Sequence, residues 1–451
     1  MPGAIFSFGL KISILTYADD VILLASSRTQ LQLLLNACQS HALTNGYAFS
    51  PSKCKVLVLH KNYNKIGKLF LGTHALELVE SYKYLGIDFE TRFLNFGSYL
   101  KATNQKLTLR SLTLGAIGMQ KDGLRLLTAR RIYFALIRPL VDYAAQVLNF
   151  NITTTKKFES SQMKFFKKCL GVEISTCHEL LRTVIGVEPI SCRVAKLKLS
   201  HYHRIRDTTN TILGPIITQR EPKIRGYTRE IEILHTKWNL NPEWDIAEKR
   251  RSIETQAFIR DLAKLKALEG KYSCYFLAQQ YNNVSTVGSA KYRANNILEV
   301  LSKECREHRS AFLQFLFGFS PVLREEKCDW CGYTYDFAQP QTAPTAHLLT
   351  QCQKFAQERL TLRRKISESI TMHHSYLLKV FQTSLRGDGV QAAAIMLGCN
   401  DVIFHESVEK VKCLYRRLKK LKTPSPLDTL VRHTVPLTWA IHSAYTQLAV
   451  Q

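Results

Sequence analysis

The chain has 451 residues, 45% of them hydrophobic, and its 62 Lys and Arg outnumber 36 Asp and Glu, which gives a net charge of +26. This length exceeds one typical domain and allows roughly two to four folded units with buried cores. The positive surplus favours a polyanionic partner, above all nucleic acid, over a merely soluble basic protein.

Membrane insertion and secretion are not expected. No apolar run approaches the roughly 18 residues that a membrane-spanning helix needs, and Lys11 and two aspartates interrupt the apolar N-terminus. The 12 cysteines are scattered singly except for one cluster, which favours a reducing compartment over a secreted disulfide framework. The nucleus or the cytoplasm is the expected location, and no membrane partner is predicted.

Residues Ile12 to Ala25 predict a β-hairpin with an acidic turn. Two apolar runs rich in β-branched residues flank the corner Tyr17-Ala18-Asp19-Asp20, as in strands joined by a tight turn. Adjacent carboxylates repel one another unless a cation compensates them, and Mg²⁺ is commonly held by one or two carboxylates together with substrate phosphates. The alternative is a solvated turn in which Asp tolerates the backbone geometry.

Further elements follow the hairpin in a definite order. A capping-box pattern at Ser27 to Gln30 predicts a helix that ends near Gly46. A loop that contains Lys53 comes next, then an apolar strand, Val56 to Leu59, and the stretch Tyr82-Lys83-Tyr84-Leu85-Gly86-Ile87.

This order resembles the reverse transcriptases of non-LTR (LINE-like) retrotransposons, with their Y-x-D-D hairpin, helix with its glycine, lysine-bearing loop and Y-x-Y-L-G primer grip. The resemblance implies a partial polymerase palm in which Asp19 and Asp20 bind Mg²⁺ as the catalytic pair and Lys53 protonates departing pyrophosphate. That family also uses an upstream third aspartate and a fingers region. Residues 1 to 16 contain no acidic side chain, so we expect the chain as given to be catalytically incomplete.

The stretch from Tyr99 to Pro139 is helical in pattern and strongly basic, with Asp122 as its one acid. Such a surface can follow phosphates without reading sequence, and an ordinary solvated helix face is the alternative. Its position corresponds to the thumb of the resembled family, which grips the template-primer duplex. The candidate nucleic-acid-binding residues are Lys101, Lys106, Arg110, Arg125, Arg130 and Arg131.

The resemblance continues to about residue 205 through apolar and glycine positions that report packing and carry no chemistry. These are the elements P-L-x-x-Y from Pro139, L-G-V from Leu170 and L-x4-G-x2-P-I from Leu181. A loop-rich segment follows, and then Ile246 to Glu269 and Lys291 to Leu316 predict basic amphipathic helices. This region is predicted to be a helical connector.

The second candidate site is the pattern Cys328-x2-Cys331-x15-His347-x4-Cys352. Three thiolates and one imidazole complete a closed tetrahedral zinc site, whereas free cysteines and an isolated histidine are the alternative. The pattern also resembles the C-terminal zinc knuckle of LINE-like elements, although its central spacer is long. Trp330 and Tyr333 offer stacking surfaces to single strands or cover the metal.

Helices are predicted at Gln357 to Met372, Gly389 to Leu397, Ile403 to Lys422 and Pro436 to Leu448. The fold class is therefore α+β: a partial palm with an antiparallel sheet and a helix, then mostly α-helical thumb and connector and a small zinc knuckle. The predicted domains are the palm at 1–95, the thumb and post-thumb region at 96–205, the connector at 206–320, the zinc knuckle at 321–360 and a helical region at 361–451.

Two functions compete. The first is a fragment of a retrotransposon RNA-directed DNA polymerase that binds an RNA template and a DNA primer, or an RNA–DNA hybrid, with Mg²⁺ and Zn²⁺ as cofactors. The second is a non-catalytic, zinc-containing nucleic-acid-binding protein of the same descent. A helical scaffold without nucleic acid would leave the charge of +26 and the Cys/His cluster unexplained. The oligomeric state stays open.

Overall fold

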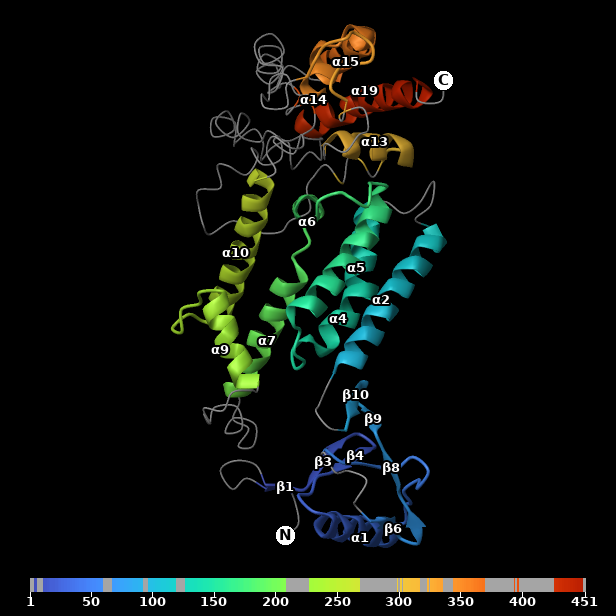
Figure 1. Cartoon of the computed structure of the whole chain (residues 1–451), viewed down its shortest axis with the longest axis vertical. Helices are drawn as coiled ribbons and strands as arrows, with labels where there is room; N and C mark the ends of the chain where they lie inside the picture. The colour runs from blue at the N-terminus through green and yellow to red at the C-terminus, as the bar shows by residue number, and fades with distance from the viewer. Residues whose placement is uncertain are drawn as a thin grey trace. The chain divides into compact units, whose positions relative to one another are not determined.

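The computed structural model (Figure 1) describes residues 4–5, 11–59, 67–91, 96–118, 126–207, 227–267, 298, 301, 303–316, 323, 325–335, 344–369, 393, 396 and 426–448. In these residues, small two-stranded sheets, mostly antiparallel, are followed by helices, in agreement with the predicted α+β class. The chain forms two compact units, and each is discontinuous in sequence. The first unit comprises Met1–Lys106, Asp142–Thr154 and Leu197–Asn239, and the second comprises Leu107–Val141, Thr155–Lys196 and Leu240–Gln451. The five sequence-based domains stay a prediction.

The predicted acidic hairpin is present in the first unit. Strand β3 (Ile14–Tyr17) pairs antiparallel with β4 (Asp20–Leu23), and Tyr17 lies opposite Asp20. Ala18 adopts a left-handed φ of 54° in the turn, a conformation that a two-residue hairpin connection requires. Just before this hairpin, β1 (Ala4–Ile5) pairs with β2 (Lys11–Ile12).

Helix α1 (Arg28–Thr44) follows the hairpin and begins where the capping pattern predicts. The Ser27 side chain accepts a hydrogen bond from the Gln30 backbone N–H, which satisfies one of the unpaired donors of the first turn. The Gln30 side chain accepts from Ser26 N–H rather than from Ser27. Gly46, with φ +71°, follows the helix in the left-handed conformation that glycine adopts at low cost.

A small apolar core lies between α1 and the next strands. Leu35 of α1 packs with Val56, Leu69 and Leu71, and Leu23 of β4 borders this cluster. Strand β5 (Lys55–Leu57), slightly shorter than predicted, pairs parallel with β8 (Glu77–Val79). Between them, β6 (Phe70–Leu71) pairs with β7 (His74–Ala75). The core therefore ties the acidic hairpin to the loop that contains Lys53.

The Y-x-Y-L-G stretch forms a second hairpin, of β9 (Ser81–Tyr84) and β10 (Ile87–Glu90). Leu85 and Gly86 form its turn with φ values of 46° and 79°. The Tyr143 hydroxyl donates a hydrogen bond to the Leu85 carbonyl, and a Cβ on Gly86 would lie 3.4 Å from the Tyr143 ring. Glycine at this position thus meets both a backbone and a packing requirement.

The predicted basic helical stretch is helical where it is described. It consists of α2 (Gly97–Gly118), α3 (Leu126–Ile132), a π-helical turn (Tyr133–Ile137) and α4 (Arg138–Ala145). Tyr133 is fully buried, and its hydroxyl donates to Gln162. Asp122 and Arg125 lie outside the described residues.

Helices α5 (Ile152–Leu170), α6 (His178–Ile185) and α10 (Ile246–Ala267) belong to the second unit, apart from the first residues of α5. Arg182 of α6 joins all three. Its guanidinium donates to both carboxylate oxygens of Asp261 on α10 at 2.7 Å and to Glu159 on α5 at 2.6 Å. Burial of these charges is possible because each is paired.

Helices α7 (Ile190–Arg206) and α9 (Tyr227–Lys237) follow in the connector region. The Tyr227 hydroxyl donates to the Lys198 carbonyl at 3.1 Å, and the Lys198 ammonium pairs with Glu230. Of the predicted connector helices, α10 matches closely. The second predicted helix, Lys291 to Leu316, is wrong as one continuous element: residues 303–305 are not helical, and α13 begins at Arg306 and ends at Leu316. Most of residues 291–302 lie outside the described part of the chain.

The C-terminal region packs α13 and α15 (Ala356–Ser369) against α19 (Pro426–Leu448). The predicted start of the last helix, at Pro436, is wrong: α19 begins ten residues earlier, at Pro426. Proline suits this first position because a backbone N–H there would have no acceptor within the helix. Pro436 lies inside the helix. The predicted helix at 403–422 lies outside the described residues, as does most of that at 389–397. No described helix is long and apolar enough to cross a bilayer.

Candidate catalytic hairpin, basic surface and metal centre

The two hairpin carboxylates are presented to solvent. Asp19 lies in the turn and Asp20 opens β4, and both side chains are exposed. Within the described part of the chain, no third carboxylate, histidine or cysteine joins them in a group that could hold an ion. Asp19 and Asp20 could therefore hold Mg²⁺ only with ligands from elsewhere, such as substrate phosphates.

Lys53 lies in a short turn that precedes β5. Its backbone N–H donates to the Ser50 carbonyl at 3.0 Å, and its own carbonyl lies 3.4 Å from the Tyr82 hydroxyl on β9. The Lys53 side chain is exposed. This turn is therefore held by the second hairpin, while its ammonium is left in solvent.

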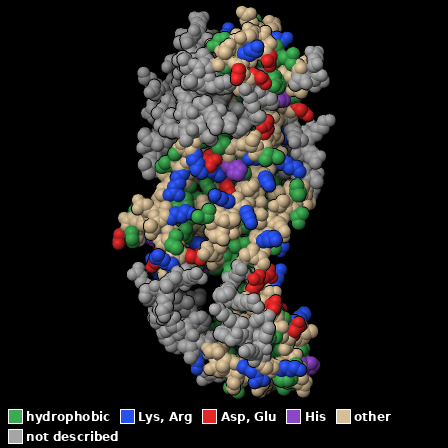
Figure 2. Space-filling model, in the orientation of Figure 1, with side chains coloured by type: hydrophobic (Ala, Val, Ile, Leu, Met, Phe, Trp, Pro, Cys, Tyr) green, Lys and Arg blue, Asp and Glu red, His purple; other side chains and the backbone are tan. Residues whose placement is uncertain are grey.

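The candidate nucleic-acid-binding residues occupy different surfaces. Lys101, Lys106 and Arg110 are exposed on α2, but at about 100° per residue Lys101 and Arg110 point to opposite sides of the helix. Arg110 also donates to the Leu136 carbonyl at 3.0 Å. On the face drawn in Figure 2, Lys and Arg side chains are spread among other types rather than gathered in one patch.

Arg130 and Arg131 differ in their surroundings. Arg131 is exposed, whereas Arg130 donates to the carbonyls of Ile185 and Gly186 at 2.8 and 3.1 Å and lies 4.6 Å from the Phe134 ring centroid. A cation at the C-terminal end of α6 is favoured by the helix dipole. Burial, with the neighbouring Arg138, lowers the pKa of Arg130. Arg130 thus has a packing role besides any contact with phosphate.

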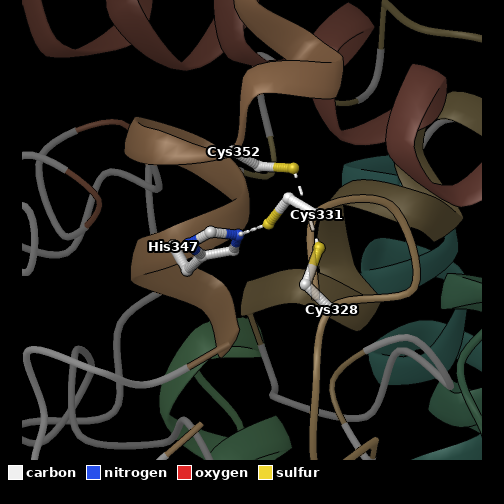
Figure 3. Close-up of side chains that lie close together, drawn as sticks. All are labelled: Cys328, Cys331, His347 and Cys352. Carbon is white, nitrogen blue, oxygen red and sulfur yellow. Dashed lines mark hydrogen bonds between the residues drawn. The ribbon is translucent and has the colours of Figure 1, made fainter. Parts of the chain in front are cut away.

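The Cys/His cluster comes together in the second unit (Figure 3). Cys328 and Cys331 come from a turn. His347 begins the π-helical turn His347–Gln351, which follows α14 (Pro344–Ala346), and Cys352 comes directly after that turn. The Sγ atoms of Cys328 and Cys352 are 3.7 Å apart, Cys331 Sγ is 3.2 Å from His347 Nε2, and all four ligand atoms lie within 4.8 Å of one another. Tetrahedral zinc with Zn–S bonds of 2.3 Å would separate two sulfurs by about 3.8 Å. The donor set fits zinc in number, type and spacing.

Local backbone geometry builds this cluster. Gly332 has φ +70°, its N–H donates to the Cys328 carbonyl, and Cys328 N–H donates to the Tyr333 carbonyl, both at 2.8 Å. Cys352 N–H donates to the His347 carbonyl at 2.8 Å, which closes the π-helical turn and brings the two ligands to one side. The tight turns explain why x2 and x4 spacings converge on one point.

The ionisation of the ligands suits a metal. Burial lowers the pKa of His347, which favours the neutral imidazole that a metal requires. For Cys328, burial acts to raise the pKa, but hydrogen bonds from the Trp330 and Cys331 backbone N–H groups and from the Tyr335 and Cys331 side chains together lower it. Burial raises the pKa of the Cys352 thiol to about 12, so a metal ion must displace that proton on binding.

The two aromatic residues of the knuckle have partners within the fold. Tyr333 stacks on His347, with ring centroids 4.5 Å apart and an interplanar angle of 6°, and Trp330 packs edge-on against Phe355 at 4.9 Å. Sequence reasoning missed Arg359, a buried residue of α15 that donates to the Cys352 carbonyl. No local signal separates it from Arg363 and Arg364 in the sequence.

Comparison with known families supports the first part of this site. The family described as reverse transcriptase (RNA-dependent DNA polymerase) matches residues 3–89, a segment that contains both carboxylates of the first hairpin, α1, Lys53 and nearly all of the second hairpin. No curated protein matches the chain. Residues 3–89 are therefore similar to part of the reverse transcriptase family.

Proposed function

We propose that the chain is part of a non-LTR (LINE-like) retrotransposon reverse transcriptase, which binds an RNA template and a DNA primer for RNA-directed DNA synthesis. The observation that carries this proposal is the pair Asp19 and Asp20 on a tight hairpin inside the segment that matches the reverse transcriptase family. The order of later elements, through the primer-grip hairpin to the Cys/His cluster, supports the LINE-like assignment.

In this function, each part has a chemical task. Asp19 and Asp20 hold Mg²⁺, which when bound activates the primer hydroxyl and neutralises charge on the phosphate oxygens. The exposed ammonium of Lys53 is suited to protonating departing pyrophosphate, and the exposed cations of α2 and α3 to neutralising backbone phosphates. Cys328, Cys331, His347 and Cys352 hold Zn²⁺ as a structural ion.

The set of metal ligands that catalysis requires is expected to be incomplete in this chain. Two metal ions that bridge attacking and leaving oxygens need a well-defined set of ligands, and the described residues provide two carboxylates with no third beside them. We expect no extension of a DNA primer on an RNA template by the 451-residue chain with Mg²⁺ and deoxynucleotides. Primer extension resolved on a sequencing gel is the measurement.

The control is a fusion of the chain to the upstream palm and fingers segment of a reconstructed element, which should extend the primer. Asp19→Ala in that fusion should abolish synthesis, while Asp88→Asn, in β10 of the second hairpin, should leave most of it. Extension by the unfused chain that disappears on Asp19→Ala would show that the ligand set is already complete. Extension by the fusion that survives Asp19→Ala would refute the catalytic role of the hairpin.

Nucleic-acid binding should be salt-sensitive and weakly sequence-selective, because exposed Lys and Arg neutralise phosphates without reading bases. Replacing Lys101, Lys106 and Arg131 together by Gln should make the negative slope of log K against log salt shallower by about 2 to 3 for an RNA–DNA hybrid. Fluorescence anisotropy over a salt series measures the slope. Arg130 is left unchanged because it also caps α6.

The matched control removes the same charge elsewhere, by changing Arg229, Arg363 and Arg364 to Gln. Arg229 and Arg364 are 60% and 71% exposed, so their loss should disturb the fold little. If both triple variants flatten the slope equally, binding depends on net charge alone and the assigned surface is wrong. A hybrid affinity that does not depend on salt would refute the electrostatic mechanism itself.

A further inference from the structure

Arg359 lies in the first turn of α15, next to the segment that supplies His347 and Cys352. The residue is only 8% exposed. Its guanidinium donates to the carbonyl of Cys352, a ligand, and lies 3.5 Å from the carbonyl of Leu348, the residue after the ligand His347. Both carbonyls belong to the π-helical turn and its end. One side chain from a neighbouring helix therefore holds the segment that supplies two of the four ligands.

The charge of Arg359 needs compensation. A buried guanidinium is costly unless an anion balances it, and among the ion pairs formed by described residues none includes Arg359. Once a metal has displaced its proton, the Cys352 thiolate is the neighbouring anion that favours the Arg359 charge most; Glu358 favours it less and Arg363 opposes it. The two carbonyl oxygens accept hydrogen bonds from the Arg359 guanidinium but supply no full charge.

The Cys/His cluster supplies the missing charge when it holds zinc. Three thiolates and a neutral imidazole around Zn²⁺ carry a net charge of −1, and the guanidinium carries +1. We propose that Arg359 is a positioning residue of the zinc centre, which orients the His347–Cys352 turn through its carbonyls and neutralises the anionic cluster. This inference rests on the proposed zinc site and adds a residue outside the four ligands.

The test compares zinc affinity in full-length variants. Arg359→Met keeps the apolar stem and removes the charge, Arg359→Lys keeps the charge and loses the fork of donors, and Arg363→Met is the control because Arg363 is exposed on the same helix. Competition with a chromogenic chelator measures affinity. Loss of a residue that supports ligands typically costs about 10- to 100-fold in metal affinity, which we expect for Arg359→Met, with a smaller loss for Arg359→Lys.

Cobalt gives a second readout. Co²⁺ in the wild-type site should show the strong visible absorption of a tetrahedral thiolate complex, and Arg359→Met should keep that spectrum at saturating Co²⁺, because all four ligands remain. Zinc affinity of Arg359→Met equal to that of Arg363→Met would overturn the inference while leaving the zinc site intact. A wild-type chain that binds neither metal would instead overturn the site itself.

Discussion

Cys331→Ser and His347→Ala should each remove zinc from the purified chain, from about one equivalent to almost none. The four ligand atoms lie within 4.8 Å of one another, and a structural site that loses one ligand opens to water and releases the ion. Metal analysis by mass spectrometry after desalting measures the change. Because metal binding contributes to folding, chelation should also expose the region that contains α14 and α15 to protease.

Cys305→Ser and His308→Ala are the controls, because each removes a cysteine or a histidine that lies outside the cluster. Cys305 is an exposed free cysteine, and neither residue belongs to the cluster, so zinc content should stay at about one equivalent per chain. If the ligand variants retain as much zinc as these controls, the assigned site is wrong. If the wild-type chain carries no zinc and takes up none from a buffered solution, the four residues are free side chains.

Arg182→Met should destabilise the second unit by about 3–5 kcal/mol, because it leaves the carboxylates of Asp261 and Glu159 buried without their partner. The Arg182 and Asp261 side chains are only 5% and 4% exposed, and their two hydrogen bonds are both 2.7 Å long. Removal of one member of a buried pair costs far more than the pair contributes. Urea unfolding followed by circular dichroism measures the loss.

Arg260→Met on α10 is the matched control, since Arg260 is exposed and its change should stay within about 0.5 kcal/mol. The double variant Arg182→Met with Asp261→Leu should recover part of the loss, because an apolar side chain needs no counter-charge. Equal stabilities of Arg182→Met and Arg260→Met would show that the ion pairs between α5, α6 and α10 carry little of the stability.

The features that the sequence predicted well depend on short spacings. The hairpin around Asp19, the Ser27 cap and Gly46 each follow from residues within one or two turns of chain. The Cys/His cluster was found because ligand chemistry restricts the possible spacings. By contrast, the pairing of Arg182 with Asp261 joins residues 79 positions apart, and no local pattern connects them.

Two kinds of position misled sequence reasoning. The prediction starts the last helix at Pro436, yet this proline lies inside α19, which packs on α13 and α15. Arg130 is predicted to bind nucleic acid, but its guanidinium also caps α6. The sequence does not distinguish an arginine that donates to backbone carbonyls from one that is free to bind phosphate, because the residue type and the charge are the same.

The discontinuity of the first unit has a consequence for synthesis on the ribosome. Its final segment, Leu197–Asn239, is made long after Lys106, so at about 5–20 residues per second the unit stays unfinished for on the order of ten seconds. During this interval the hairpin side chains of Ile14, Leu15 and Tyr17, which are 48%, 44% and 65% exposed even in the finished fold, are open to other nascent chains. Slow translation between Lys106 and Asn239 should therefore lower the yield of soluble protein, and a chaperone that shields the hairpin should raise it.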